Sequence, residues 1–245
     1  ALVAIQKGYR LKVVVRDSLS KEKMDQLRAL GAEIQTVDHT LAPEHPDSYN
    51  NITPRIAAET PGCYFPDQHN NRDNNETHYM TTGPEIWEQM DGKIDIVVAG
   101  MGTGGTVCGV GRFLKEQDPN IRVVAVDPAG SIFYDWFHHG KLVKPGPYLI
   151  EGLGDEFLIK TANFDVLDDM IRVSDRDAFH MARRLVREEG VLGGGSSGAA
   201  MWAVMKVAED LSPGKRIVTI FPDGAGRYLS TIFNDDWMRK KGLLP

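Results

Sequence analysis

Cysteine is scarce in this chain, and its two cysteines do not have the sequence spacing of a metal site or a redox motif. Cys63 and Cys108 are the only ones among 245 residues, and they lie far apart without C-x-x-C spacing. The seven histidines are scattered along the chain. Such usage suits a reducing compartment and argues against a structural zinc site. We therefore expect a cytoplasmic protein that holds no metal.

An excess of basic charge and a long apolar run are also missing. The net charge of -6 leaves no electrostatic footprint for nucleic acid or for an anionic membrane surface. No apolar stretch approaches the roughly 20 residues that cross a bilayer. The 42% hydrophobic and 25% charged content is ordinary for a globular chain. We expect small-molecule partners, without nucleic acid or membrane.

Glycine, in contrast, is concentrated between a predicted strand and a predicted helix. Residues 94–99 are apolar and β-branched, as in a buried strand, and residues 106–114 have helical spacing. A glycine loop that opens a helix brings backbone N–H groups and the helix dipole against an anion. The pattern predicts a phosphate cradle, since a simple turn needs fewer glycines. The cradle residues are Gly100, Gly102, Thr103, Gly104, Gly105 and Thr106.

The same loop also fits a dinucleotide-binding motif. Residues 100–105 read G-x-G-x-x-G, and a second predicted strand at 121–126 ends at Asp127. That acid lies at about the offset at which dinucleotide folds keep their ribose ligand. Local sequence therefore leaves an NAD(P)-dependent oxidoreductase open.

Helices and strands alternate along the chain, which predicts an α/β fold with parallel strands. A polar, asparagine-rich stretch at 70–76 predicts a boundary between a smaller domain, residues 1–70, and a large cofactor-binding domain, residues 71–245. We expect residues 131–149 to form a long irregular loop. Further strands are expected at 11–16, 33–37, 63–65 and 216–221, and further helices at 20–30, 47–60, 76–90, 175–189 and 199–211.

Four turns are expected to meet at one edge of the sheet. They lie at residues 100–106, 127–130, 193–198 and 222–226, after strands or before helices. In an open α/β sheet the carboxyl ends of the strands share one edge, and ligands bind there. Loops far apart in sequence would then surround a single ligand.

Seven short motifs follow one another in a familiar order: 67–68 (DQ), 81–86 (TTGPEI), 102–106 (GTGGT), 126–128 (VDP), 151–154 (EGLG), 193–198 (GGGSSG) and 222–223 (PD). In this order they resemble the β-family of pyridoxal-phosphate (PLP) enzymes, fold type II, which includes the cysteine synthases and cystathionine β-synthases. Residues 233–244 resemble the end of a cystathionine β-synthase catalytic core, most closely in its bacterial form. The resemblance spans the chain and implies two α/β domains with mainly parallel sheets, the smaller one incomplete.

This resemblance implies that the ligand of the cradle is PLP and not a dinucleotide. It implies that Ser196 hydrogen-bonds the pyridine nitrogen, and that Asp127 is a loop residue without a ribose to bind. A neutral hydroxyl does not hold that nitrogen protonated, which favours β-elimination to an aminoacrylate. The residues implied to hold the cofactor phosphate are Gly102, Thr103, Gly104, Gly105 and Thr106.

The resemblance also implies a substrate site made by Gln68, His69 and Gly152. Gln68 matches a residue that contacts the substrate carboxylate, and Gly152 lines the cleft in relatives. His69 stands where relatives commonly have tyrosine or phenylalanine. Asp155 stands where eukaryotic synthases have tyrosine, and an acid there suits the bacterial pattern.

The implied activity is β-replacement on serine, or an activated serine, with homocysteine, giving cystathionine. An O-acetylserine sulfhydrylase, which uses sulfide, is the nearest alternative, and a non-catalytic binding subunit is a second. The resemblance also implies a homodimer.

The family's Schiff-base lysine has no counterpart in this sequence. The lysine motif and the loop that grips the substrate carboxylate would precede Ala1, and residues 1–5 look like the interior of a helix that Gly8 ends. We therefore expect a fragment of a longer enzyme, with no catalytic residue of its own and inactive alone.

Overall fold

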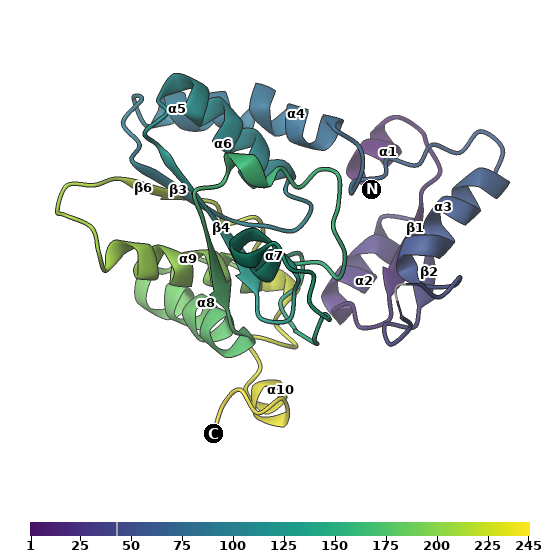
Figure 1. Ribbon diagram of the computed structural model, residues 1–245. Helices are drawn as coiled ribbons and strands as arrows, with labels where there is room; N and C mark the ends of the chain where they lie inside the picture. The colour runs from purple at the N-terminus through teal and green to yellow at the C-terminus, as the bar shows by residue number, and fades with distance from the viewer. Residues whose placement is uncertain (43) are drawn as a thin grey trace. The chain divides into compact units, whose positions relative to one another are not determined.

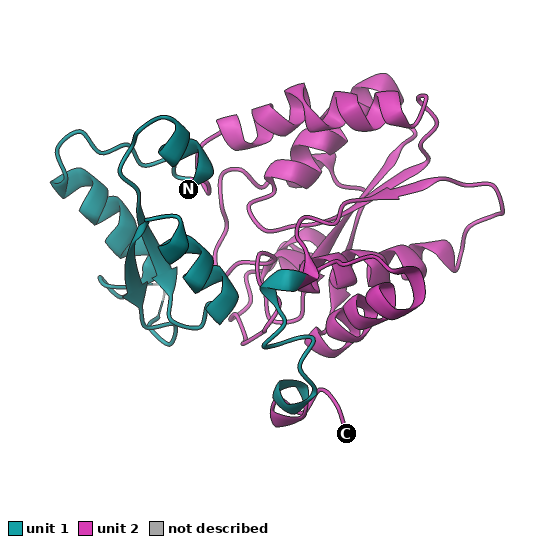
Figure 2. Cartoon of the chain, turned by 180° about the vertical axis from the view of Figure 1, so that it is seen from behind, with its two compact units in different colours: residues 1–67, 226–238 teal, residues 68–225, 239–245 magenta. Residues whose placement is uncertain are grey.

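The structure is a computed structural model that describes residues 1–42 and 44–245. The chain forms two compact units, which Figure 2 distinguishes by colour. Unit 1 comprises residues 1–67 and 226–238, and unit 2 comprises residues 68–225 and 239–245. The domain division at residue 70 stays a prediction, and the two units are described separately.

Unit 1 contains a two-stranded parallel sheet. Its strands pair in register from Lys12↔Glu33 to Arg16↔Val37. Val14, Val15 and Val37 on the strands and Met24 on a helix form its buried apolar centre. The elements of residues 1–67 are α1 (Leu2–Gln6), β1 (Lys12–Arg16), α2 (Lys21–Ala29), β2 (Glu33–Val37) and α3 (Tyr49–Glu59).

A distant segment, residues 226–238, joins unit 1 through side-chain hydrogen bonds. The Ser20 hydroxyl donates to the Arg227 carbonyl at 3.1 Å, and it makes no capping hydrogen bond to α2 although Ser20 occupies the N-cap position. Ser230 donates from its backbone N–H and its hydroxyl to the Glu22 carboxylate, at 2.8 and 2.9 Å. The nearby elements are η2 (Ala225–Arg227) and α10 (Asp235–Lys240).

Unit 2 is built on a four-stranded parallel sheet of order β5-β4-β3-β6. Ile96 of β3 pairs with Arg122 of β4 and Ile217 of β6. This arrangement confirms the predicted α/β fold with parallel strands. The sequence did not predict β5. The strands are β3 (Ile96–Gly100), β4 (Arg122–Pro128), β5 (Asp169–Val173) and β6 (Ile217–Thr219).

Helices cover both faces of this sheet (Figure 1). Buried strands then carry apolar side chains on both sides, as β3 and β4 do. None of the helices in the part of the chain that the structure describes is long and apolar enough to cross a bilayer. One face carries α4 (Asp73–Met80), α5 (Thr82–Gln89) and α6 (Gly105–Gln117), and the other carries α8 (Asp175–Glu189) and α9 (Gly195–Ala208).

Three local predictions are wrong. Residues 63–65 form no strand, because no neighbouring strand pairs with them, and Tyr64 stays 77% exposed. The helix expected at 76–90 is two helices, α4 and α5, because Pro84 lacks an N–H and would clash with the carbonyl of Met80 in a continuous helix. Residues 131–149 contain a short helix, α7 (Phe133–His139), which Gly140 ends in a left-handed conformation.

Candidate functional site

The predicted cradle lies between β3 and α6. Gly104 precedes the helix in a left-handed conformation, with φ 76°, which glycine adopts without strain. The first backbone hydrogen bond of α6 runs from Cys108 N–H to the Gly104 carbonyl at 2.9 Å. The N–H groups of Gly105, Thr106 and Val107 therefore have no partner within the helix. Together with the positive end of the helix dipole they form an anion site.

Close neighbours explain two of the cradle glycines. A Cβ on Gly102 would lie 2.4 Å from the Gly152 carbonyl oxygen, and one on Gly105 would lie 2.0 Å from Asn74 Oδ1. Gly154 N–H also donates to the Met101 carbonyl at 2.8 Å. The motif at residues 151–154, which contains Gly152, thus lies directly beside the cradle.

The two threonine hydroxyls of the cradle are held by side chains that the sequence did not single out. Asn74 Nδ2 donates to Thr103 Oγ1 at 2.9 Å, and His78 Nε2 lies 3.1 Å from Thr106 Oγ1. Asn74 lies in the stretch that the sequence assigns to a polar boundary loop. Its spacing of four from His78 would have been informative had residues 73–80 been recognised as a helix.

Gln68 and His69 lie next to the cradle. The Gln68 carbonyl accepts a hydrogen bond of 2.9 Å from Asn74 Nδ2, and the His69 carbonyl accepts one of 3.0 Å from Thr161 Oγ1. His69 Nε2 lies 3.7 Å from Asp155 Oδ2, so this imidazole has an acidic neighbour. The structure therefore places both residues at the expected edge of the site. Their contacts with substrate stay predictions.

Ser196 lies in the first turn of α9, which begins at Gly195, before the predicted start at 199. The neighbouring Ser197 hydroxyl donates to the Asp223 carbonyl at 3.4 Å, and Gly194 N–H donates to the same oxygen at 3.1 Å. Ser196 is only 5% exposed, yet its hydroxyl makes no hydrogen bond with any residue that the structure describes. No hydrogen bond joins it to the cradle either, although α9 packs against β3. A hydroxyl with free hydrogen-bonding capacity suits a ligand nitrogen.

Asp127 belongs to β4 and is fully buried, so its assignment to a loop is wrong. Its Oδ2 accepts a hydrogen bond of 2.9 Å from Tyr134 N–H, while its Oδ1 has no partner in the described parts of the chain. Burial raises the pKa of this carboxyl to about 7. A ribose hydroxyl cannot reach a fully buried carboxylate. This observation removes the main local support for a dinucleotide.

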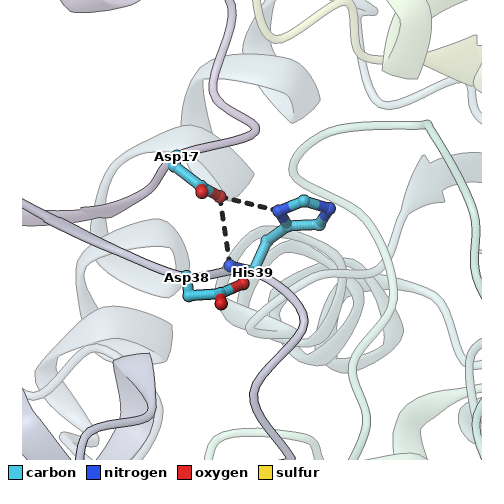
Figure 3. Close-up of side chains that lie close together, drawn as sticks. All are labelled: Asp17, Asp38 and His39. Carbon is cyan, nitrogen blue, oxygen red and sulfur yellow. Dashed lines mark hydrogen bonds and ion pairs between the residues drawn. The ribbon is translucent and has the colours of Figure 1, made fainter.

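A cluster of three exposed side chains lies where β1 and β2 of unit 1 end (Figure 3). His39 Nδ1 lies 2.7 Å from Asp17 Oδ1, which also accepts from His39 N–H at 3.1 Å. Asp38 accepts hydrogen bonds of 2.8 and 2.7 Å from the backbone and hydroxyl of Thr40. Internal hydrogen bonds thus account for the arrangement of these acids and the imidazole.

The residues of unit 2 fit PLP chemically. The N–H groups of Thr106 and Val107 at a helix start, with two adjacent hydroxyls, suit a phosphate monoester. The neutral hydroxyl of Ser196 suits a pyridine nitrogen. The chain belongs to the family of pyridoxal-phosphate dependent enzymes, whose model matches residues 1–223.

Among individual relatives, the chain is similar to enzymes called cystathionine β-synthase. It is 40% identical to that of Apis mellifera over 244 residues, which are 100% of this chain and 48% of the relative. It is 40% identical to that of Rattus norvegicus, with 100% and 43% covered. It is 38% identical to that of Saccharomyces cerevisiae over 251 residues, with 99% and 49% covered. The chain therefore spans less than half of the length of these relatives.

Proposed function

We propose that the complete protein is a PLP-dependent β-replacement enzyme that joins serine, or an activated serine, to homocysteine and gives cystathionine. The observation that carries this proposal is the pairing of a phosphate cradle on α6 with Ser196, a residue of α9 that is 5% exposed and whose hydroxyl has no hydrogen-bond partner in the described parts of the chain. The identity of about 40% to cystathionine β-synthases across all of this chain supports the choice of reaction.

In this proposal the residues of the chain bind the cofactor and orient it. The N–H groups of Thr106 and Val107 and the hydroxyls of Thr103 and Thr106 hold the phosphate of the cofactor. Ser196 meets its pyridine nitrogen as a neutral group and leaves that nitrogen unprotonated. When bound, the cofactor withdraws electrons from the α-carbon of the amino acid. Gly152, whose own Cβ position is open and whose carbonyl oxygen lies beside Gly102, keeps room for the substrate.

Product analysis with competing substrates tests the reaction. The complete protein, saturated with PLP, is given serine with homocysteine in one assay and O-acetylserine with sulfide in another. We expect cystathionine in the first assay at the higher rate. Exclusive formation of cysteine from sulfide would replace our proposal by an O-acetylserine sulfhydrylase, and cofactor binding without any turnover would replace it by a binding subunit.

The assembly and location of the protein remain proposals too. We infer a homodimer and a cytoplasmic location, supported by the family resemblance and by the two widely spaced cysteines. Light scattering of the complete protein, which gives its mass in solution, would test the dimer.

A further inference from the structure

One helix, α4, contacts both threonines of the cradle. Asn74 and His78 are four residues apart, so they lie on the same side of α4, and this side faces the start of α6. Asn74 Nδ2 lies 2.9 Å from Thr103 Oγ1, and His78 Nε2 lies 3.1 Å from Thr106 Oγ1. Each hydroxyl that would meet the phosphate thus has its own partner on α4.

The close approach of α4 depends on two glycines of α6, also four residues apart. A Cβ on Gly105 would lie 2.0 Å from Asn74 Oδ1, and one on Gly109 would lie 2.8 Å from the His78 Cβ and 2.4 Å from the Asn75 carbonyl oxygen. Without side chains at these positions the helices come near enough for hydrogen bonds. The sequence of α6 therefore makes room for the polar side of α4.

The geometry at Thr103 determines where its hydrogen points. A hydroxyl has two lone pairs and one hydrogen. Thr103 Oγ1 accepts from Asn74 Nδ2 at 2.9 Å and from Gly105 N–H at 3.4 Å. The second hydrogen of the Asn74 amide is engaged by the Gln68 carbonyl at 2.9 Å, which fixes the amide. Since both lone pairs of Thr103 are engaged, its O–H remains to donate to an anion.

The ring of His78 lies between two hydroxyls. Its Nδ1 lies 2.9 Å from Thr82 Oγ1, and its Nε2 lies 3.1 Å from Thr106 Oγ1. Burial lowers the pKa of His78, so the ring is held neutral, with one donor and one acceptor nitrogen. If Nε2 accepted, Thr106 would give its hydrogen to the ring and turn a lone pair towards the phosphate. An anion on the cradle therefore selects the form in which Nε2–H donates to Thr106 and Nδ1 accepts from Thr82.

We propose that Asn74 and His78 are positioning residues of the phosphate cradle. They donate to Thr103 and Thr106 and thereby direct both hydroxyl hydrogens towards the phosphate of the cofactor. This inference rests on the cofactor binding in the proposed function and adds a second layer of residues to it. It assigns to α4 the role of setting the preference of the site for a phosphorylated ligand.

Variants of the two residues in the complete protein test this role. Asn74→Ala and His78→Leu remove the donor without adding charge. His78→Gln keeps an amide N–H near the place of the imidazole Nε2–H. Thr77→Ala is the matched control on the same helix, because the exposed Thr77 hydroxyl bonds only to the Asp73 carbonyl, away from the cradle. Circular dichroism establishes that each variant is folded.

The decisive measurement compares the affinities for PLP and for pyridoxal, which lacks the phosphate. We expect Asn74→Ala and His78→Leu each to weaken PLP binding about tenfold while pyridoxal binding changes by less than about twofold. His78→Gln and Thr77→Ala should keep the ratio of the two affinities. A variant that weakens both ligands equally shows general damage to the fold and overturns the positioning role, as does an unchanged ratio in both donor-free variants.

The outcomes also separate this inference from the proposed reaction. If the unaltered protein prefers PLP and the donor-free variants lose that preference, the inference stands even when no cystathionine is made. If cystathionine is made and the preference survives in both variants, only the inference fails. If the unaltered protein binds both ligands equally, the cradle assignment and this inference fall together.

Discussion

The role of the cradle can be tested at a single glycine. Gly104 has φ 76°, and a Cβ there would lie 3.1 Å from the Thr161 carbonyl oxygen and from Ala162 Cα. Gly104→Asp and Gly104→Asn meet the same neighbours and tolerate this backbone conformation about equally. Only the aspartate adds a negative charge to the anion site. We expect it to abolish PLP binding in a spectroscopic titration, while the asparagine variant retains measurable binding.

Equal losses in the two Gly104 variants would mean that crowding, not charge, prevents binding. The cradle would then have no demonstrated preference for an anion. Gly226→Ala serves as the reference substitution. It has no atom within 4 Å of its added Cβ and no positive φ, so it should leave PLP affinity unchanged.

Asp127 gives the protein a pH dependence with a definite sign. Burial raises its pKa from 3.8 to about 7, although the Tyr134 N–H donates a hydrogen bond to it and Arg172 lies nearby with Asp135. Between these two pH values the folded protein keeps a proton that the unfolded chain loses. The contribution to stability is complete below pH 3.8 and is lost as the pH rises through 7, at up to about 1.4 kcal/mol per pH unit.

Urea unfolding from pH 5 to 8 measures this effect. Asp127→Asn should gain stability relative to the unaltered protein as the pH rises, because its side chain carries no charge to bury. Parallel stability curves for the two proteins would contradict the assignment of the titration to Asp127.

At the residue scale, the sequence predicts the chemical role of a residue better than it predicts which residues that residue contacts. The residue types and spacing of the glycines and threonines at 102–106 are sufficient to predict an anion site. Asn74 and His78 could not be identified, because their importance comes from contacts with the two threonines of the cradle, about 30 positions away in the sequence. Asp127 was misplaced because a charged residue at a strand end is usually exposed, and its burial is a property of the packed sheet.

At the scale of elements, the start of α8 is the clearest case of local sequence control. The Ser174 hydroxyl accepts from Asp177 N–H at 3.1 Å and donates to its carboxylate at 2.6 Å. This reciprocal pair of hydrogen bonds resembles a capping box, with serine at the N-cap and an acid three residues later. Ser174→Ala should lower the free energy of unfolding by about 1 kcal/mol, measured with urea. Ser174→Asp keeps an acceptor and should lose less, and equal losses would show that the cap contributes nothing.

Elements without such local signals were predicted less well. The strand β5 was missed because Arg172 interrupts its apolar residues, whereas β1 has three consecutive valines. It forms because β4 offers it a free edge, from Val124↔Asp169 to Pro128↔Val173. Conversely, residues 63–65 look like a strand but find no edge to pair with. Strand formation depends on partners that local sequence does not reveal.

At the scale of the whole molecule, the predicted turns meet in pairs within unit 2, whereas their convergence on a single ligand stays a prediction. Gly194 N–H bonds to the Asp223 carbonyl, and Met101 N–H bonds to the Val126 carbonyl, so turns far apart in sequence meet along the sheet edge. The parallel order of the strands makes this meeting predictable. The return of residues 226–238 to unit 1 was not predictable, since it depends on side-chain contacts such as Ser230 with Glu22, 208 positions apart.

The division into units predicts which backbone amides PLP protects from hydrogen exchange. The cradle, Ser196 and Gly152 all belong to unit 2, whereas β1 and β2 belong to unit 1. A ligand stabilises the part that binds it, so hydrogen exchange should slow at residues 101–108 and 194–200 when PLP is added to the complete protein. Residues 12–16 and 33–37 should change little, and pyridoxal should protect 194–200 more than 101–108. Equal protection of both sheets would mean that the units open together and that binding energy is shared by the whole chain.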